Sequence, residues 1–376
     1  MKEVGIRSPL VVAGYKSEIL EKALSGIRIV RQKEALGSAH AVSVALKAMR
    51  RHPKDTLIVC CDTPLIKAES IRRLIEHRRA SDASAVLLTA MVDNPSGYGR
   101  VIKTRHGEVM KIVEEIDALP EERAIGEINV GAYCFKTADL IWALKRIDPD
   151  NKKKEYYLTD AIGLLHAQKK RIGSVMASSS DEALGINSRS DLAEAIHLKR
   201  TEILKDLMAS GVTIIDPATT FIDSDVTIGM DSVVYPGTII ERGTRIGKRC
   251  RIGPFARVRK NVTLGNNVEI GNFVELVRTA VGDNSKIKHL SYLGDAVVGK
   301  NVNIGAGFIT ANFDGKNKNR TIIEDGSFLG VGSILIAPSR VGRRSTVGAG
   351  CVVTKNFRVP RGTTVVGIPA RVLKRK

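Results

Sequence analysis

Residues 227–252 read TIGMDSVVYPGTIIERGTRIGKRCRI, and an aliphatic residue recurs in this stretch at every sixth position. A six-residue period fits neither the stripe of a single helix nor the alternation of a plain strand. It is typical of a solenoid of short parallel strands, in which the aliphatic residue points inward and three hexapeptides close one triangular coil. Successive coils of such a solenoid stack at the usual strand spacing of ~4.8 Å.

The period continues on both sides of this stretch, with an irregular part between residues 277 and 322. Glycine often follows the aliphatic residue, as in TIGMDS, RIGKRC and TLGNNV, which suits tight turns at the corners. We therefore predict a parallel β-helix over residues 212–376. The inward positions are Ile222, Ile228, Val234, Ile240, Ile246, Ile252, Val258, Leu264, Ile270 and Leu276, then Ile323, Leu329, Leu335, Val341, Val347 and Val353.

The first half of the chain alternates between apolar runs and helical stretches. The strand-like runs include PLVVAGY, IRIVRQ, TLIVCCD and ASAVLLTAMV, and the helical stretches include GSAHAVSVALKAMRR and SIRRLIEHRRASD. This alternation predicts an α/β domain over residues 1–188, with a mostly parallel sheet covered on both faces. A linker helix is expected within 189–211, with Ser190 as its N-cap and apolar residues along one side. These apolar residues are Leu192, Ile196, Ile203, Leu207 and Met208.

Composition narrows the class of protein. The 376 residues carry a net charge of +19, but aromatic residues make up only 4%, which argues against a stacking platform for single-stranded nucleic acid. The charge fits either a solvated basic face or phosphorylated small molecules, and a nucleic-acid role rests on charge alone. No apolar run approaches the ~20 residues of a membrane span, and the first residues do not resemble a signal peptide. Five scattered cysteines without a CxxC spacing indicate neither disulfides nor a zinc site, and so predict a reducing cytosol.

One histidine lies in an unusual setting, in the stretch SKIKHLSYLGDA at residues 285–296. His289 stands there among small, apolar and hydroxyl residues, with Lys286, Lys288 and Tyr292 nearby. An isolated histidine of this kind is more often a packed residue than a proton carrier. The neutral imidazole nevertheless suits a general base near neutral pH, so both interpretations stay open on the residues alone.

Longer motifs bring in a resemblance that runs along nearly the whole chain. They are, in order, QKEALGSAHA, NPSGYGRV, EINVG, EYYLTD, GINSR, GVTIIDP, IGPFARVR, GNFVEL, HLSYLGDA, NVNIGAG and NFDGKNK. The chain thereby resembles the bifunctional bacterial N-acetylglucosamine-1-phosphate uridylyltransferase/glucosamine-1-phosphate acetyltransferase family. The resemblance implies a Rossmann-like nucleotidyltransferase domain and a left-handed parallel β-helix. It also implies a homotrimer with acetyltransferase sites between subunits. The composition in turn predicts a cytoplasmic protein with no nucleic-acid partner and no stable membrane insertion.

The resemblance assigns an acetyltransferase site to the β-helix. His289 falls at the family's general base for attack of the sugar amine on acetyl-CoA, and Glu275 at the carboxylate that orients this imidazole. The sugar-phosphate positions are Arg259, Tyr292, Asn303 and Lys318, and the acetyl-CoA positions are Ala306, Asn312, Phe313, Val331 and Ala349. Arginine and lysine supply the contacts that phosphate favours. Backbone N–H groups near Ala306 are expected to stabilise the oxyanion.

Some positions of the β-helix depart from the family pattern. Val277 stands where the family has a lysine, with Arg278 one residue later, and Val331 stands where it has a serine. The family's extended C-terminal arm, with its coenzyme-binding arginine, has no counterpart, and Arg371 or the last lysines are candidates to replace it. These departures leave two alternatives, an acetyltransferase for another amino sugar and a non-catalytic sugar-nucleotide-binding scaffold. A scaffold needs no base, so His289 argues against the second.

The resemblance also assigns a uridylyltransferase site to the first half. It uses UTP, N-acetylglucosamine 1-phosphate and Mg²⁺, and it leads to UDP-N-acetylglucosamine for peptidoglycan and lipopolysaccharide. The chain begins after the position of the family's glycine-rich triphosphate loop, so we expect inefficient UMP transfer and retention of weak sugar-nucleotide binding. The nucleotide and sugar positions are Gln32, Gly37, Ser38, Gly99, Glu114, Asn129 and Asn187, and the magnesium ligands are Asp62 and Asn187.

Overall fold

The computed structural model describes residues 2–373. The chain divides into two compact units, Met1–Ala195 and Ile196–Lys376. The division falls inside helix α7 (Arg189–Ala209), which belongs to both units.

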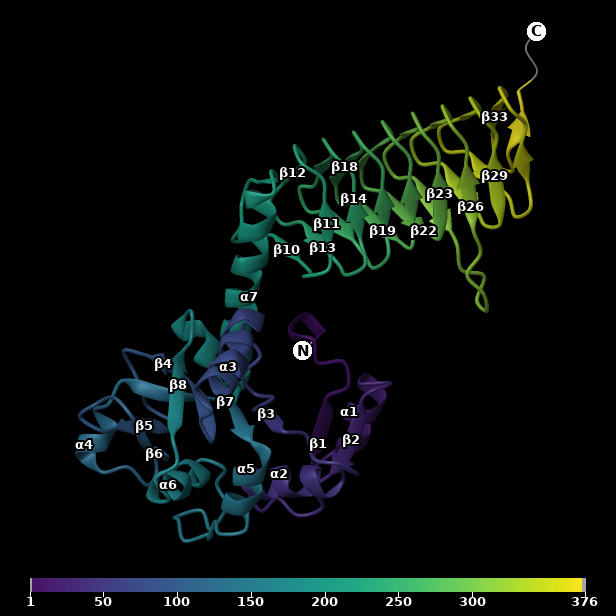
Figure 1. Cartoon of the computed structure of the whole chain (residues 1–376). Helices are drawn as coiled ribbons and strands as arrows, with labels where there is room; N and C mark the ends of the chain where they lie inside the picture. Colours follow the sequence, from purple (N-terminus) through teal and green to yellow (C-terminus); the bar gives the residue numbers. More distant parts are fainter. Residues whose placement is uncertain (1, 374–376) are drawn as a thin grey trace. The chain divides into compact units, whose positions relative to one another are not determined.

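The second unit is a left-handed parallel β-helix built from very short strands (Figure 1). Each strand pairs in parallel with the strand that comes three places later in the chain. The strands therefore form three flat faces, each named here after its first strand. The β9 face holds β9 (Thr213–Ile214), β12 (Val233–Val234), β15 (Arg251–Ile252), β18 (Glu269–Asn272), β21 (Lys286–His289), β24 (Asn303–Ile304), β27 (Phe328–Leu329), β30 (Thr346–Val347), β33 (Thr364–Val366) and the antiparallel β34 (Arg371–Val372).

The other two faces hold eight strands each. The β10 face holds β10 (Phe221–Ile222), β13 (Ile239–Ile240), β16 (Arg257–Val258), β19 (Glu275–Val277), β22 (Tyr292–Gly294), β25 (Ile309–Ala311), β28 (Ile334–Ile336) and β31 (Val352–Val353). The β11 face holds β11 (Thr227–Ile228), β14 (Arg245–Ile246), β17 (Thr263–Leu264), β20 (Ala280–Val281), β23 (Ala296–Val298), β26 (Thr321–Ile323), β29 (Ser339–Val341) and β32 (Arg358–Val359).

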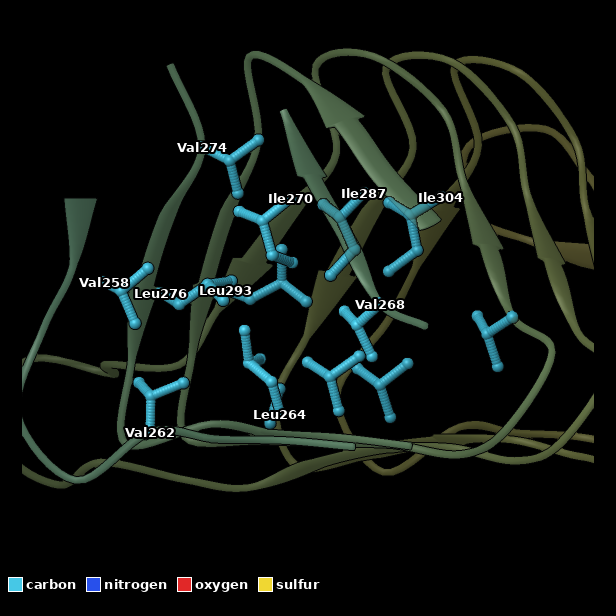
Figure 2. Packing of buried hydrophobic residues seen from close by; sticks show 14 of the residues in the cluster. Val258, Val262, Leu264, Val268, Ile270, Val274, Leu276, Ile287, Leu293 and Ile304 are labelled. Carbon is cyan, nitrogen blue, oxygen red and sulfur yellow. The ribbon is translucent and has the colours of Figure 1, made fainter. Parts of the chain in front are cut away.

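The predicted inward residues form the core of the coil. All of them are buried, and they belong to one continuous apolar cluster. Figure 2 shows Val258, Leu264, Ile270 and Leu276 from consecutive strands among the buried side chains inside the coil. Because each strand is only a few residues long, this stacking of aliphatic side chains, with the backbone ladders, holds the coils together.

The irregular stretch 277–322 has three local causes. Leu276 and Val281 are five residues apart instead of six, as are Leu293 and Val298, so two corners are one residue shorter. Thr310 takes an inward position, where its buried hydroxyl accepts a hydrogen bond from the Gly294 N–H at 2.8 Å. Between β25 and β26 the loop 312–320 is inserted, and Figure 1 shows it projecting from the coil near β26. The aliphatic step then resumes.

The first unit contains a mixed sheet, so the expectation of a mostly parallel sheet was wrong. Strand β7 (Glu127–Lys136) runs antiparallel to β4 (Ala85–Met91) on one side, and to β5 (Arg100–Lys103) and then β3 (Asp55–Val59) on the other. Strand β6 (Val109–Val113) pairs antiparallel with β5. Only β8 (Ile172–Met176) joins this sheet in parallel, against β4. Strands β1 (Leu10–Ala13) and β2 (Arg28–Arg31) form a separate parallel pair.

Helices of the first unit surround these strands, and their apolar residues fill two buried clusters. The α-helices are α1 (Ser17–Ala23), α2 (Ser38–Lys47), α3 (Ala68–Ser81), α4 (Pro120–Arg123), α5 (Thr137–Leu144) and α6 (Asp160–Ala167). Two short 3₁₀ helices, η1 (Lys2–Val4) and η2 (Ser180–Ala183), complete the unit.

Helix α7 is capped two residues earlier than expected. The Ser188 hydroxyl accepts from the Asp191 N–H at 3.2 Å, and the Asp191 carboxylate accepts from the Ser188 N–H at 2.8 Å. This reciprocal pair makes Ser188 the N-cap, and Ser190 lies inside the helix. Near its other end, Leu204 is buried in the core cluster of the coil, and Ile203 and Leu207 pack against this cluster. The other residues of the expected apolar side, Leu192, Ile196 and Met208, are exposed.

In the part of the chain that the structure describes, no helix is both long and apolar enough to cross a membrane. All five cysteines are free thiols.

Candidate functional sites

His289 is the last residue of β21, at the corner between the β9 and β10 faces, and its side chain is exposed. It pairs in register with Asn272 of β18, and its Nδ1 lies 3.1 Å from the Asn272 Oδ1. Glu275, which we expected to orient the imidazole, instead accepts a hydrogen bond from the Arg259 guanidinium at 3.1 Å. Within one chain, the hydrogen-bond partner of His289 is thus an amide that the sequence motifs did not single out.

The corner that carries His289 also carries three predicted acetyl-CoA residues, one from each of the next three coils. Backbone hydrogen bonds tie these turns together: Gly307 donates to Leu290, Gly332 to Ala306, and Gly350 to Val331. Ala306, Val331 and Ala349 therefore form a column that begins beside His289. We call this column, with His289 at its start, the His289 corner. Val331 is 59% exposed, so an apolar surface stands where the family pattern has a serine.

The glycines that precede these residues make the close stacking possible. A Cβ on Gly330 would lie 2.5 Å from the Ala349 nitrogen, and one on Gly305 would lie 2.7 Å from the Val331 nitrogen. Both distances are shorter than a side chain tolerates, so the sequence of this corner requires glycine at these steps.

Three of the four predicted sugar-phosphate residues lie on two faces of the coil, and the fourth, Lys318, lies in the inserted loop. Tyr292 and Glu275 are register partners on the β10 face, and Arg259 follows β16 of the same face. The Tyr292 hydroxyl and the Asn312 amide converge over Gly294, where a Cβ would lie 2.6 Å from both. Asn303 lies on the β9 face, on the other side of the His289 corner from Tyr292, and it is the register partner of Lys286.

An ion pair fixes the region around Asn312. The Arg278 guanidinium donates to both carboxylate oxygens of Asp295, at 2.6 and 2.8 Å, and the Asn312 amide donates to the same carboxylate at 2.6 Å. These hydrogen bonds, Arg278 first, lower the pKa of Asp295. Position 277, where the family pattern has a lysine, holds a buried valine that is 4% exposed and offers no cation to a substrate. Arg278, the next residue, is already paired with Asp295. The motifs had not indicated Asp295 as a partner.

The inserted loop holds the last two residues of the predicted site. Phe313 and Lys318 face each other in an antiparallel bridge, and both are exposed. Asp314 fastens the loop, because its carboxylate accepts from the Lys316 and Asn317 N–H groups at 3.1 and 2.8 Å. These backbone donors hold the pKa of Asp314 well below its usual range.

In the first unit, the predicted uracil-reading segment packs against the EYYLTD motif. Gly37 has φ 108°, and a Cβ there would lie 2.5 Å from the Tyr156 carbonyl oxygen, so glycine is required. The Ser38 hydroxyl accepts from the Leu158 N–H at 2.9 Å. The Gln32 amide lies 2.9 Å from the His40 Nδ1 and also donates to the Gly37 carbonyl.

The predicted sugar-binding residues share one region of the mixed sheet. The Asn129 N–H donates to the Gly99 carbonyl at 2.9 Å, and a Cβ on Gly99 would lie 3.4 Å from the Glu114 carboxylate. The Thr159 hydroxyl donates to Glu114 at 2.9 Å, a partner that sequence reasoning missed. Burial raises the pKa of Glu114, and burial with the neighbouring Glu114 and Asp117 charges raises the pKa of Asp160 to about 6.

Asp62 and Asn187 are the predicted magnesium ligands. Asp62 lies in the turn three residues after β3 ends, rather than at the end of the strand itself. Its carbonyl oxygen accepts from the Ile186 N–H at 2.7 Å, which brings the GINSR motif beside it. A carboxylate and an amide oxygen, both exposed, fit Mg²⁺, which is commonly bound by one or two protein groups together with substrate phosphates. No group of three or more His, Cys, Asp or Glu side chains forms a metal site in the described residues.

Comparison with known proteins covers both units. A nucleotidyl transferase family model matches residues 2–184, a bacterial transferase hexapeptide model matches 243–278, and a model of the hexapeptide repeat of succinyl-transferase matches 320–355. The chain is similar to the "Bifunctional protein GlmU" of three bacteria. Identity is 43% for Geobacillus sp. (strain WCH70), over 94% of this chain and 84% of that protein. It is 41% for Acetivibrio thermocellus (100% and 88%) and 38% for Clostridioides difficile (99% and 88%).

Among solved structures, a UDP-glucose pyrophosphorylase in complex with UDP-glucose is similar with a TM-score of 0.42 and 16% identity. The similarity covers 54% of this chain and 83% of that chain.

Proposed function

This chain belongs to the GlmU family of bifunctional transferases, and we propose that His289 is the general base of its acetyltransferase site. The chain is a glucosamine-1-phosphate acetyltransferase that uses acetyl-CoA, in a family that also transfers UMP from UTP, with Mg²⁺, to the acetylated sugar. The observation that supports our assignment is the His289 corner, where the imidazole lies at the start of a column of predicted acetyl-CoA residues.

The chemistry needs a base because the sugar amine is largely protonated near neutral pH. In our proposal the neutral His289 accepts a proton from the ammonium group through Nε2, and the freed amine attacks the thioester carbonyl carbon. The positively charged nitrogen of the tetrahedral intermediate gives its second excess proton to water, and the intermediate collapses with cleavage of the C–S bond. Coenzyme A leaves as a thiolate, which takes the first proton back from the imidazolium. The products are the N-acetyl sugar phosphate, coenzyme A and one proton released to solvent.

An oxyanion donor is available beside the base. Gly305 and Gly307 donate their N–H groups to Leu329 at 2.8 Å and Leu290 at 3.1 Å. The N–H of Ala306 between them has no acceptor in the described part of the chain. A backbone donor that is already fixed in place stabilises a developing oxyanion without reorganisation, so we assign this role to Ala306.

The sugar phosphate is assigned to Arg259 and Lys318, with Tyr292, Asn303 and Glu275 around the sugar. We assign the coenzyme to Ala306, Val331 and Ala349, with Asn312 and Phe313 of the inserted loop. Arg371 in β34 is a candidate for a coenzyme phosphate, while the other candidates, Lys374 and Lys376, lie outside the described part of the chain.

Lys318→Ala tests the phosphate assignment. A charge-assisted hydrogen bond to phosphate is worth about 1.5–3 kcal/mol, so we expect KM for glucosamine 1-phosphate to rise about 10-fold or more. KM for acetyl-CoA is expected to stay within about two-fold of wild type. Lys316→Ala is the matched control, because Lys316 is an exposed lysine of the same loop to which we assign no contact with substrate. Equal KM values for the two variants would contradict the role of Lys318.

We further propose a homotrimer, supported by the β10 face. Its outward residues include the exposed Phe221, Ile239 and Ile309, an apolar set that a neighbouring subunit would cover. The same face carries Glu275 and Tyr292, so a neighbour there would approach the sugar site. Sedimentation at micromolar concentration is expected to give a particle of about three times the chain mass of 40.8 kDa. A monomer would contradict the intersubunit site.

We assign the nucleotide and sugar of the uridylyltransferase site to Gln32, Gly37, Ser38, Gly99, Glu114, Asn129 and Asn187. Asp62 and Asn187 would hold Mg²⁺, which when bound neutralises phosphate charge. In this assignment Thr159 orients the Glu114 carboxylate toward the sugar. A cytoplasmic location completes the proposal and is supported by the five free thiols.

A further inference from the structure

Asn272 and His289 are the last residues of two adjacent strands and form a register pair. Two hydrogen bonds hold them together: the Leu290 N–H donates to the Asn272 carbonyl at 3.0 Å, and the side chains meet at 3.1 Å between Nδ1 and Oδ1. The strands approach closely because Gly271 precedes Asn272, and a Cβ at Gly271 would overlap the Lys288 carbonyl oxygen. The Asn272 amide is therefore fixed against the imidazole by the backbone itself.

We propose that Asn272, rather than Glu275, is the positioning residue for His289, an inference that rests on the proposed role of His289 as the base. An amide oxygen accepts but does not donate hydrogen bonds, so this contact requires a hydrogen on Nδ1. In the neutral imidazole the lone pair then lies on Nε2, which is free to take the proton of the amine. Asn272 thus selects the reactive tautomer and fixes the orientation of the ring.

Glu275 has a different role in this arrangement. Its carboxylate holds the Arg259 guanidinium at 3.1 Å, and Arg259 is assigned to the sugar phosphate. Removing the charge of Glu275 loosens Arg259 and so weakens sugar-phosphate binding. The two residues separate by their kinetic signatures, because one acts through the base and the other through a substrate contact.

The charged groups near His289 are paired with one another, so the Asn272 amide is left to orient the imidazole. On β18, Glu269 is bound by both lysines of β21, Lys286 at 3.1 Å and Lys288 at 3.0 Å. On β24 the register partner of Lys286 is the uncharged Asn303, and on β22 the nearest titratable group is Tyr292. A neutral amide orients the ring without adding a charge, whereas a carboxylate at position 272 would stabilise the imidazolium.

The test compares full-length Asn272→Ala, Asn272→Asp, Glu275→Gln and His289→Ala with wild type. Thiol release from acetyl-CoA is measured with glucosamine 1-phosphate across pH 5.5–9. Asn272→Ala is expected to lower kcat about 10–100-fold, a range taken from residues that orient metal-binding histidines, with both KM values within about two-fold of wild type. Asn272→Asp keeps the acceptor, so kcat is expected to recover while the acidic limb of the pH–rate profile moves up by about one unit. Glu275→Gln is expected to raise KM for the sugar phosphate and leave that limb in place.

Two controls make the result specific. Asn266→Ala removes another asparagine side-chain contact between coils, in which the Asn266 Oδ1 accepts from the Lys248 backbone N–H at 2.9 Å. It lies at a corner away from His289, and the variant is expected to leave kcat unchanged. The double variant Asn272→Ala/His289→Ala is expected to have the same kcat as His289→Ala alone, because Asn272 acts only through His289.

The outcomes separate two failures. Wild-type kcat in Asn272→Ala, with His289→Ala inactive, would overturn the role of Asn272 and leave His289 as the base. If Glu275→Gln instead lowers kcat and shifts the acidic limb of the pH–rate profile, Glu275 is the positioning residue and the proposal for Asn272 is overturned. Wild-type turnover in His289→Ala would overturn the base assignment, and the role of Asn272 with it.

Discussion

Phe308→Ala is expected to lower the free energy of unfolding of the β-helix by about 3–5 kcal/mol, the usual cost of removing a buried aromatic side chain. Phe308 is 0% exposed and belongs to the continuous apolar cluster of the coil. Its neighbours are held by the backbone ladders of adjacent coils, so they cannot collapse into the space it leaves. Urea unfolding followed by circular dichroism measures the change as a lower midpoint.

Phe328→Ala is the matched control for this prediction. Phe328 is the first residue of β27, and its side chain is 48% exposed on the outside of the β9 face. Its removal opens no internal cavity, so we expect a loss below about 1 kcal/mol. Similar losses in both variants would contradict the assignment of Phe308 to the interior.

The coil could be predicted from the sequence because its period is local. An inward aliphatic residue at every sixth position follows directly from the geometry of a three-sided coil, and the structure confirms each predicted inward position. The irregular stretch could not be resolved in the same way. The polar Thr310 is inward there because a neighbouring coil, distant in sequence, supplies Gly294 as its hydrogen-bond partner.

The sheet of the first unit shows the opposite case. Runs such as ASAVLLTAMV indicate strands correctly, and β4 lies within that run. Strand direction depends instead on which distant strand becomes the neighbour. The long strand β7 has β4 on one side and β5 and β3 on the other, and it runs antiparallel to all three. No local pattern in the sequence predicts these pairings.

Motif resemblance supplied the candidate site residues, but it did not supply their partners. The contacts of His289 with Asn272, of Glu114 with Thr159 and of Asn312 with Asp295 join residues from different strands and loops. Asn272 lies in the quoted motif GNFVEL, so the register of β18 and β21 was the missing information. These partners are set by how the coils and strands stack.

His289→Ala is expected to lower kcat for acetyl transfer about 10²–10⁴-fold, the range that a positioned general base contributes. The imidazole is exposed at the end of β21, so its removal leaves the buried Ile287 and the core of the coil intact. KM for acetyl-CoA is therefore expected to change little. Residual activity should rise with pH, because a larger fraction of the amine is then unprotonated without help from the enzyme. An unchanged pH dependence would contradict a role in proton transfer.

The central claim is that the β-helix transfers an acetyl group to glucosamine 1-phosphate with His289 as the base. The most direct measurement is thiol release from acetyl-CoA in the presence of glucosamine 1-phosphate, with full-length wild type and His289→Ala compared at equal concentration and pH 7.5. We predict steady turnover by wild type, one thiol for each N-acetyl sugar phosphate formed, and a loss of at least about 100-fold in the variant. Equal rates from the two proteins would contradict the account.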